Sequence, residues 1–474
     1  MGLPGLKRCL DSLGEIYCKR MHYPSSRVYV DGNILLYIVK EINEVVTVDA
    51  FMRLILEIEQ YFMDDKIVAS GEGDVFFIIT FDGVAPYQKL PEQISRRKKR
   101  LEETTITSPD YFDLGNQVFR TMLAELEEKL VANSWHVISH ALEGEGEQKL
   151  ANRISKDILH HDEHNIIMIS KDWDTVMILL SIEPLRTRLY LYMLYSLPLF
   201  MNRIIDIRLL RKRITAICPV SHYMASVLLF GCDFIPGINN IELHPRILNK
   251  LIYMPEWIQL DDNTCLLSVK RFIDALSILQ EHRKELLKER NKDIQPFVLY
   301  NNIGVPSKLE AKNQSSDSLS DGQQYREIDT TTTECTSICP TCHPEHYTPN
   351  ESKEDITNHF LNTYMWTILY FSNRNVRVRI TPLHEHNDEV VYSWHIAPHC
   401  KTLKRCMLSS ANMDCIDKLH YQFTMTEIEV IPYTTYCNLV SKAVRRKELF
   451  QKECEFNPTL HLKPKLLGNV LDKT

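Results

Sequence analysis

The sequence has no apolar stretch of membrane-spanning length, no recognisable signal peptide and no internal repeat. Its 13 cysteines follow no regular framework of the kind that stabilises small secreted domains. These absences argue against a membrane-spanning protein and against a secreted domain held together by disulfides. We therefore expect an intracellular protein without a membrane partner, with the cytoplasm favoured over the nucleus.

An excess of basic charge is also absent. The chain carries 55 Lys and Arg against 62 Asp and Glu, a net charge of −7. This balance argues against nonspecific nucleic-acid binding driven by overall charge, but it is compatible with a local basic patch beside an acidic site. The length of 474 residues, with 44% hydrophobic and 25% charged residues, is ordinary for a globular protein of two or three domains.

One short stretch concentrates carboxylates around glycine. In residues 143–149 (EGEGEQK), three glutamates alternate with two glycines, and an amphipathic run begins at Leu150. Carboxylates this close together raise each other's pKa, so a cation usually compensates, and a divalent metal ion is the natural candidate. Glycine allows the sharp turn by which side chains two residues apart converge on one ion. Taken alone, the stretch fits an acidic loop before a helix equally well.

Other acids follow apolar runs typical of buried strands. Residues 28–30, 75–81, 165–170 and 228–230 are such runs, and each is followed by one or two acids. In an α/β fold, functional sites are built where strands end. Together with residues 143–149, these runs make five segments that would bring seven acids to one edge of a sheet: Asp31, Asp82, Glu145, Glu147, Asp172, Asp174 and Asp233. Such hard oxygen ligands suit two Mg²⁺ or Mn²⁺ ions, the usual arrangement for cleaving phosphodiesters.

A basic segment follows Asp82. Pro91 suits the first turn of a helix, and Lys89 lies on the loop just before it. Four polar side chains then fall near one helical face, namely Gln93, Arg96, Arg97 and Arg100. A solvated charged helix is the ordinary interpretation of this spacing. Beside an acid at a strand end, the same cluster suits a phosphate clamp next to a metal site.

These segments together resemble the Xrn-type 5′→3′ exoribonucleases of the flap-endonuclease-like superfamily. Residues 81–86 (FDGVAP) with Lys89, Gln93, Arg96 and Arg97 resemble the family signature "DGVAP..K...Q..RR", and residues 144–149 resemble "GEGEHK" with Gln148 in place of histidine. Residues 172–174 (DWD), 206–211 (DIRLLR) and 231–236 (GCDFIP) resemble "DAD", "DI..LR" and "GNDFLP". The resemblance covers about residues 1–251. More faintly, residues 364–371 and 392–398 resemble the family's aromatic second region.

The resemblance implies an α/β fold with a largely parallel, twisted central sheet between helices, and a second conserved region packed on it. It implies hydrolysis of single-stranded RNA bearing a 5′-monophosphate to nucleoside 5′-monophosphates, as in mRNA decay, with the seven acids binding two metal ions. Lys89, Gln93, Arg96 and Arg97 would bind the 5′-phosphate. Tyr37 stands where the family stacks a histidine on the first base. Trp366 would face it across the base, with Trp394 as the fallback, although either tryptophan could be a core residue.

Two other functions stay open from the sequence. The first is a DNA-directed 5′ flap nuclease, because Tyr37 leaves the preference between RNA and DNA unsettled. Flap endonucleases carry a glycine-rich helix–turn–helix after the last acid, and residues 236–243 (PGINNIEL) lack its repeated glycines. The second is an inactive RNA-binding scaffold, against which the presence of all seven acids argues.

Four segments are expected along the chain. They are a catalytic region over residues 1–251, a helical connection over 252–303, a disordered linker over 304–356 and the second conserved region over 357–474. The linker is expected because its composition is low in apolar residues. It holds a loose group of possible zinc ligands, but without a second CxxC pair incidental residues are the default interpretation: Cys335, Cys339, Cys342, His343 and His346.

Overall fold

The structure is a computed structural model that describes the elements forming the main core. The described residues are 3–18, 26–43, 45–63, 75–86, 89, 117–158, 165–182, 188–195, 203–235, 237–238, 241–289, 353–372, 377–380, 384–386, 389–391, 408–416, 418–425 and 427–430. Almost all of the predicted linker lies outside these ranges, and so do its cysteines and histidines. None of the helices in the described ranges is both long and apolar enough to cross a membrane.

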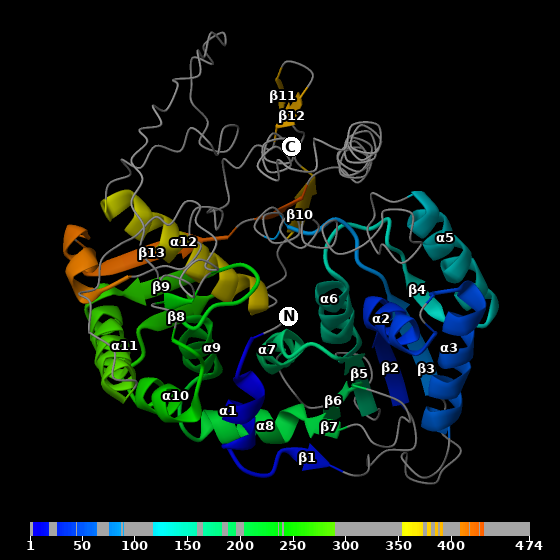
Figure 1. Cartoon of the computed structure of the whole chain (residues 1–474), viewed down its shortest axis with the longest axis horizontal. Coiled ribbons are helices and arrows are strands. Elements are labelled where there is room, and N and C mark those ends of the chain that lie inside the picture. The colour runs from blue at the N-terminus through cyan, green and yellow to red at the C-terminus, as the bar shows by residue number, and fades with distance from the viewer. Residues whose placement is uncertain are drawn as a thin grey trace, which may run out of the picture.

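A seven-stranded sheet lies in the right-hand part of the molecule as drawn in Figure 1. Its strand order is β1 (Tyr17–Cys18), β7 (Arg203–Asp206), β6 (Arg188–Met193), β5 (Asn165–Ser170), β2 (Ser26–Asp31), β3 (Val75–Thr80) and β4 (His136–Ile138). The five strands from β6 to β4 are parallel, whereas β7 is antiparallel to β6 and β1 is antiparallel to β7. The predicted α/β fold with a largely parallel central sheet is confirmed.

Alternate residues of the central strands enter two hydrophobic cores. In β5, Ile166 and Met168 belong to one core, and Ile167 and Ile169 belong to the other. This follows from strand geometry, since successive side chains point to opposite faces of a sheet. Both faces of β5 are covered by helices, which is why the strand reads as a continuous apolar run rather than as an alternating one.

Three helices cover one face of the sheet, α2 (Gly32–Asn43), α3 (Val48–Met63) and α5 (Gln117–Ala132). In α3 the buried residues Phe51, Leu54, Ile55 and Ile58 follow the three- and four-residue spacing of an amphipathic helix. The other face carries α6 (Gly146–Ile158), α7 (Asp174–Ser181) and α8 (Ile207–Thr215), together with the N-terminal α1 (Leu6–Asp11) (Figure 1).

The rest of the described chain extends this second core. It comprises α9 (Val220–Leu228), α10 (Pro245–Ile252), β8 (Ile258–Asp261), β9 (Thr264–Ser268), α11 (Val269–Glu289), α12 (Lys353–Phe371), the 3₁₀ helix η5 (Ser410–Cys415) and β13 (His420–Thr424). Strand β13 pairs antiparallel with β9, a strand of the expected connection, and α12 contacts α7 and α9 of the first region. Two further pairs are β10 (Arg377–Ile380) with β14 (Glu427–Val430), and β11 (His384–His386) with β12 (Glu389–Val391). The expected helical connection differs from prediction, because β8 and β9 form a hairpin before α11 begins.

Candidate active site

Carboxylates gather at the edge where the parallel strands end. Asp31 is the last residue of β2, Asp82 lies two residues beyond β3, and Asp172 lies two residues beyond β5. Because β2 pairs with both β3 and β5, these three strand ends are neighbours. Asp174 opens α7 directly afterwards, and its Oδ1 accepts a hydrogen bond of 2.6 Å from the backbone N–H of Leu3. The order of the strands thus brings together acids that are far apart in sequence.

The loop before α6 is held against the end of β3 by glycines. Gly83 donates its N–H to Gly144 O at 2.9 Å, and Gly144 donates its N–H to Val84 O at 2.8 Å. A Cβ on Gly83 would lie 1.8 Å from Leu142 O, so no side chain fits there. Gly144 has φ +96°, a left-handed conformation that glycine adopts without strain. The predicted sharp turn therefore exists, and it presents Glu145 and Glu147 to the strand ends.

The N-terminus of α6 meets two of the aspartates. Gly146 donates its backbone N–H to Asp82 Oδ1 at 2.7 Å. A Cβ on Gly146 would lie 3.0 Å from Asp82 Oδ1 and 3.7 Å from Asp31 Oδ1, so oxygens from two strand ends approach one point. The partial positive charge of a helix N-terminus favours carboxylates at this place.

Asp233 reaches the cluster by a different route from the one expected. The apolar run before it is the end of helix α9 and a turn, not a strand of the sheet. Its Oδ2 lies 3.6 Å from Lys89 Nζ, and the same ammonium group donates a hydrogen bond to Glu145 Oε1. Lys89 also lies 5.7 Å from the ring centre of Phe234. Lys89 therefore connects the acid loop with the segment that follows α9.

The acids affect one another's protonation. Burial, reinforced by the charge of Asp82, raises the pKa of Asp31 well above its usual range. Burial and the charge of Glu145 likewise raise the pKa of Glu147, while burial and the charge of Asp172 raise the pKa of Asp174. Lys89 can offset one negative charge among seven acids. A bound cation would therefore stabilise the ionised form of this edge.

The chemistry of these donors fits Mg²⁺ or Mn²⁺, because all seven are carboxylates. The ammonium of Lys89 between Glu145 and Asp233 marks a place where positive charge is already stabilised. Within the described ranges, however, no group of three or more His, Cys, Asp or Glu side chains is arranged to hold a metal ion. The structure brings the predicted acids to one edge without arranging them as a two-metal site.

The two predicted base-stacking residues differ in exposure. Tyr37 on α2 is 41% exposed, so its ring is accessible to a base. Trp366 on α12 is only 2% exposed, with its ring stacked 5.0 Å from that of Tyr370 and tilted 5.5 Å from that of Phe234. This burial contradicts a stacking role for Trp366 and favours the core alternative. Trp394, Gln93, Arg96 and Arg97 lie outside the described residues.

Several residues that hold the acids were not identified from the sequence. Tyr370 donates its hydroxyl to Glu145 Oε2 at 2.9 Å, and Gln148 Nε2 donates to Tyr370 O at 3.0 Å. Lys149 Nζ donates to Phe81 O at 2.9 Å and to Ser139 O at 3.1 Å, and burial lowers the pKa of Lys149 to about 8. The contacts of Tyr370 and the bond from Lys149 to Phe81 join segments distant in sequence, so no local pattern signals them.

Residues 206–211, which resemble the family's "DI..LR" motif, have a structural role in this chain. Asp206 is the N-cap of α8, and its Oδ1 accepts a hydrogen bond of 2.8 Å from Leu209 N. Arg211 donates to the backbone oxygens of Leu180 and Ile182, the latter at 3.4 Å. These contacts fix α8 against the end of α7.

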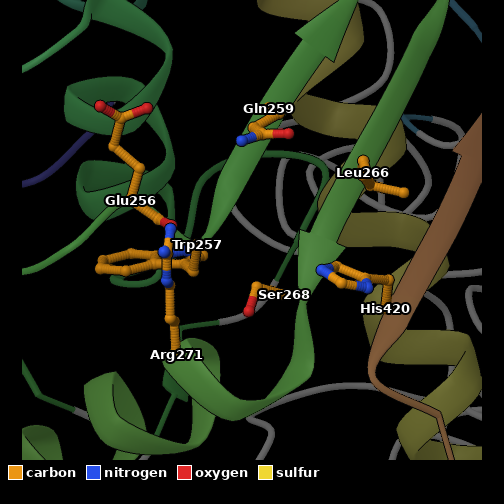
Figure 2. A pocket seen from close by; sticks show the side chains of 7 residues that line it. All are labelled: Glu256, Trp257, Gln259, Leu266, Ser268, Arg271 and His420. Carbon is orange, nitrogen blue, oxygen red and sulfur yellow. The ribbon is translucent and has the colours of Figure 1, made fainter.

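A small pocket lies in another part of the molecule. It has a volume of about 150 Å³ and is lined by Glu256, Trp257, Gln259, Leu266, Ser268, Arg271 and His420 (Figure 2). Arg271 Nη1 donates to Glu256 O at 2.7 Å beside it. The pocket belongs to β8, β9, β13 and α11, and none of the residues predicted for the acidic site lines it.

The chain matches no family model, and no curated protein matches its sequence. Among solved structures it is similar to the catalytic core of Rad2 in complex with a DNA substrate, at 17% identity and a TM-score of 0.35, covering 61% of this chain and 75% of that one. It is also similar to the T5 5′-exonuclease with bound zinc ions, at 16% identity and a TM-score of 0.34, covering 56% of this chain and 87% of that one. Likenesses this low do not decide what this chain binds or cleaves.

Proposed function

We propose that the protein is a metal-dependent 5′→3′ exoribonuclease that degrades single-stranded RNA with a 5′-monophosphate to nucleoside 5′-monophosphates. The observation that carries the proposal is the convergence of seven carboxylates, from five separate segments, on the edge where β2, β3 and β5 end. Carboxylates this close together raise each other's pKa and destabilise the folded state when they are ionised. Function is a sufficient reason to keep them.

The seven acids would hold two Mg²⁺ or Mn²⁺ ions. When bound, such ions lower the pKa of the attacking water and stabilise the leaving oxygen of a phosphodiester. The positions of Asp31, Asp82 and Asp172 at or just beyond the strand ends support this assignment, as does the glycine turn before Glu145 and Glu147. Hydrogen bonds at Asp82 and Asp174 would keep these carboxylates oriented while substrate exchanges.

Lys89 would bind phosphate in this proposal. Its ammonium is paired with Glu145 and Asp233 in the structure, and burial lowers its pKa less than these carboxylates raise it, so it remains charged at neutral pH. An incoming 5′-phosphate would offer this charge a further anionic partner beside the two carboxylates. Gln93, Arg96 and Arg97 would complete the phosphate pocket, and Tyr37 would stack on the first base.

Three RNAs of one sequence test the proposal, with a 5′-monophosphate, a 5′-triphosphate or a 5′-hydroxyl end. The protein is expected to degrade the monophosphorylated RNA fastest, and only with Mg²⁺ or Mn²⁺. Equal degradation of all three ends would defeat the phosphate pocket. A 5′-flap DNA of matched sequence is the fourth substrate, and faster cleavage of it than of the RNA would make the protein a DNA-directed flap nuclease instead.

A further inference from the structure

The last turn of α12 reaches into the acidic edge, although α12 lies far from the acids in sequence. The Tyr370 hydroxyl donates to Glu145 Oε2 at 2.9 Å, while Glu145 Oε1 accepts from Lys89. Tyr370 is 3% exposed and Glu145 is 5% exposed, so water does not compete freely for this hydrogen bond. Each oxygen of the Glu145 carboxylate thus has its own donor.

A second contact ties the same turn of α12 to the acid loop. Gln148 Nε2 donates to Tyr370 O at 3.0 Å, one turn of α6 beyond Glu145. The Tyr370 ring also lies 4.7 Å from that of Phe234, the residue after Asp233. The end of α12 therefore contacts both segments that Lys89 bridges.

We infer that Tyr370 is a positioning residue for Glu145 in metal binding, an inference that rests on the proposed function. The charged ammonium group of Lys89 donates to Oε1. A metal ion could displace this ammonium group from Oε1, and a phosphate could attract it away. Tyr370 holds Oε2 by a neutral, buried hydroxyl that neither would displace. The hydroxyl therefore fixes the carboxylate plane while Oε1 is free to change partners. Removing such an outer partner of a metal ligand typically lowers metal affinity or activity about 10- to 100-fold.

The same helix supplies a matched control in Tyr364. It is also fully buried, but its hydroxyl donates to Ala225 O at 2.6 Å and accepts from Trp257 Nε1 at 3.2 Å, in the core. Tyr370→Phe and Tyr364→Phe each remove one buried hydroxyl from α12 and keep the ring. Only Tyr370→Phe removes a donor to an acid of the site.

The test is calorimetric titration of the full chain with Mn²⁺ alone, followed by hydrolysis kinetics on 5′-monophosphorylated RNA. Tyr370→Phe is expected to weaken Mn²⁺ binding about 10- to 100-fold and to lower kcat with KM little changed, because Tyr370 contacts Glu145 and not the substrate. Tyr364→Phe is expected to lower the melting temperature without changing Mn²⁺ affinity. Wild-type Mn²⁺ affinity in Tyr370→Phe, or an equal loss in both variants, would overturn the inference.

A double-mutant cycle with Glu145→Gln keeps the result decisive if Tyr370→Phe also lowers stability. If Tyr370 acts through Glu145, the double variant binds Mn²⁺ as weakly as Glu145→Gln alone. Additive losses would contradict the positioning role. A wild-type protein that neither binds Mn²⁺ nor cleaves RNA would defeat the proposed function and the inference with it. A wild-type protein that does both, beside an unaffected Tyr370→Phe, would defeat the inference alone.

Discussion

Glu147 lies in the first turn of α6, where burial and the charges of Glu145, Asp172 and Asp31 raise its pKa. A carboxyl group whose pKa is raised on folding destabilises the folded state increasingly as the pH rises above its unfolded value of about 4.3. We therefore expect Glu147→Gln to stabilise the metal-free protein at pH 7, by on the order of 1 kcal/mol. This gain in stability should vanish at a pH below the unfolded pKa, where the protonated Glu147 of the wild type is as neutral as the glutamine of the variant.

The effect of Glu147→Gln on stability is measured by thermal unfolding in EDTA, from a pH below the unfolded pKa up to pH 7. Asp206→Asn is the control, because Asp206 caps α8 away from the acids and its substitution removes a charge without relieving their repulsion. A lower melting temperature for Glu147→Gln than for wild type at pH 7 would contradict the proposed repulsion.

At the scale of single residues, the sequence pattern indicates where an acid follows a strand, but it does not indicate whether an aromatic ring is buried. All seven acids lie at strand ends, at a helix start or after a turn, and the strand ends are readable because a continuous apolar run stops there. The role of Trp366 could not be predicted in the same way, because the sequence around an aromatic residue looks the same whether its ring lies in a core or on a stacking surface. Only the packing of α12 against Phe234 shows that its ring is buried.

Among the elements, the glycine turn between β4 and α6, which is hydrogen-bonded to the segment after β3, determines where Glu145 and Glu147 lie. Gly83→Ala is expected to displace the acid loop, because its Cβ would meet the backbone of Leu142, which cannot move aside cheaply. Gly144→Ala is the matched control, since no atom lies within 4 Å of its Cβ and only the left-handed backbone is disfavoured, by about 1–2 kcal/mol. Melting temperature and Mn²⁺ affinity should both fall further for Gly83→Ala. Equal effects of the two substitutions would show that the close approach to Leu142 does not fix the loop.

Some helices and strands follow local sequence patterns, whereas others depend on contacts with distant parts of the chain. Strands β2, β3 and β5 and helix α6 follow the predicted patterns, since each pattern is local. The run before Asp233 is helical because α9 packs on α10, α12 and β8, a choice that a short apolar run cannot reveal. The hairpin β8–β9 was missed for a similar reason, since β9 is completed by β13 from the distant second region.

For the whole molecule, α12 and the helices on one face of the sheet share a single hydrophobic core. A chain ending at residue 289 would lose α12 and expose the apolar residues that pack on it, such as Phe272, Trp257 and Phe234. We expect this fragment to lack a cooperative thermal transition and to bind the dye ANS, unlike the full chain. Co-expression with residues 353–474 should restore the transition. A fragment 1–289 that unfolds cooperatively by itself would show that these residues fold independently of α12.

If the acidic edge hydrolyses RNA as proposed, the reaction requires divalent metal ions and the carboxylates at the strand ends. Release of nucleoside 5′-monophosphates from 5′-monophosphorylated RNA, with Mg²⁺ or with EDTA, tests it most directly in wild type and in Asp172→Asn. Asp172 is half-buried beyond β5, so this variant should keep the fold. We expect release by the wild type with Mg²⁺, and none above background with EDTA or from the variant. Release that is independent of metal, or undiminished in folded Asp172→Asn, would contradict it.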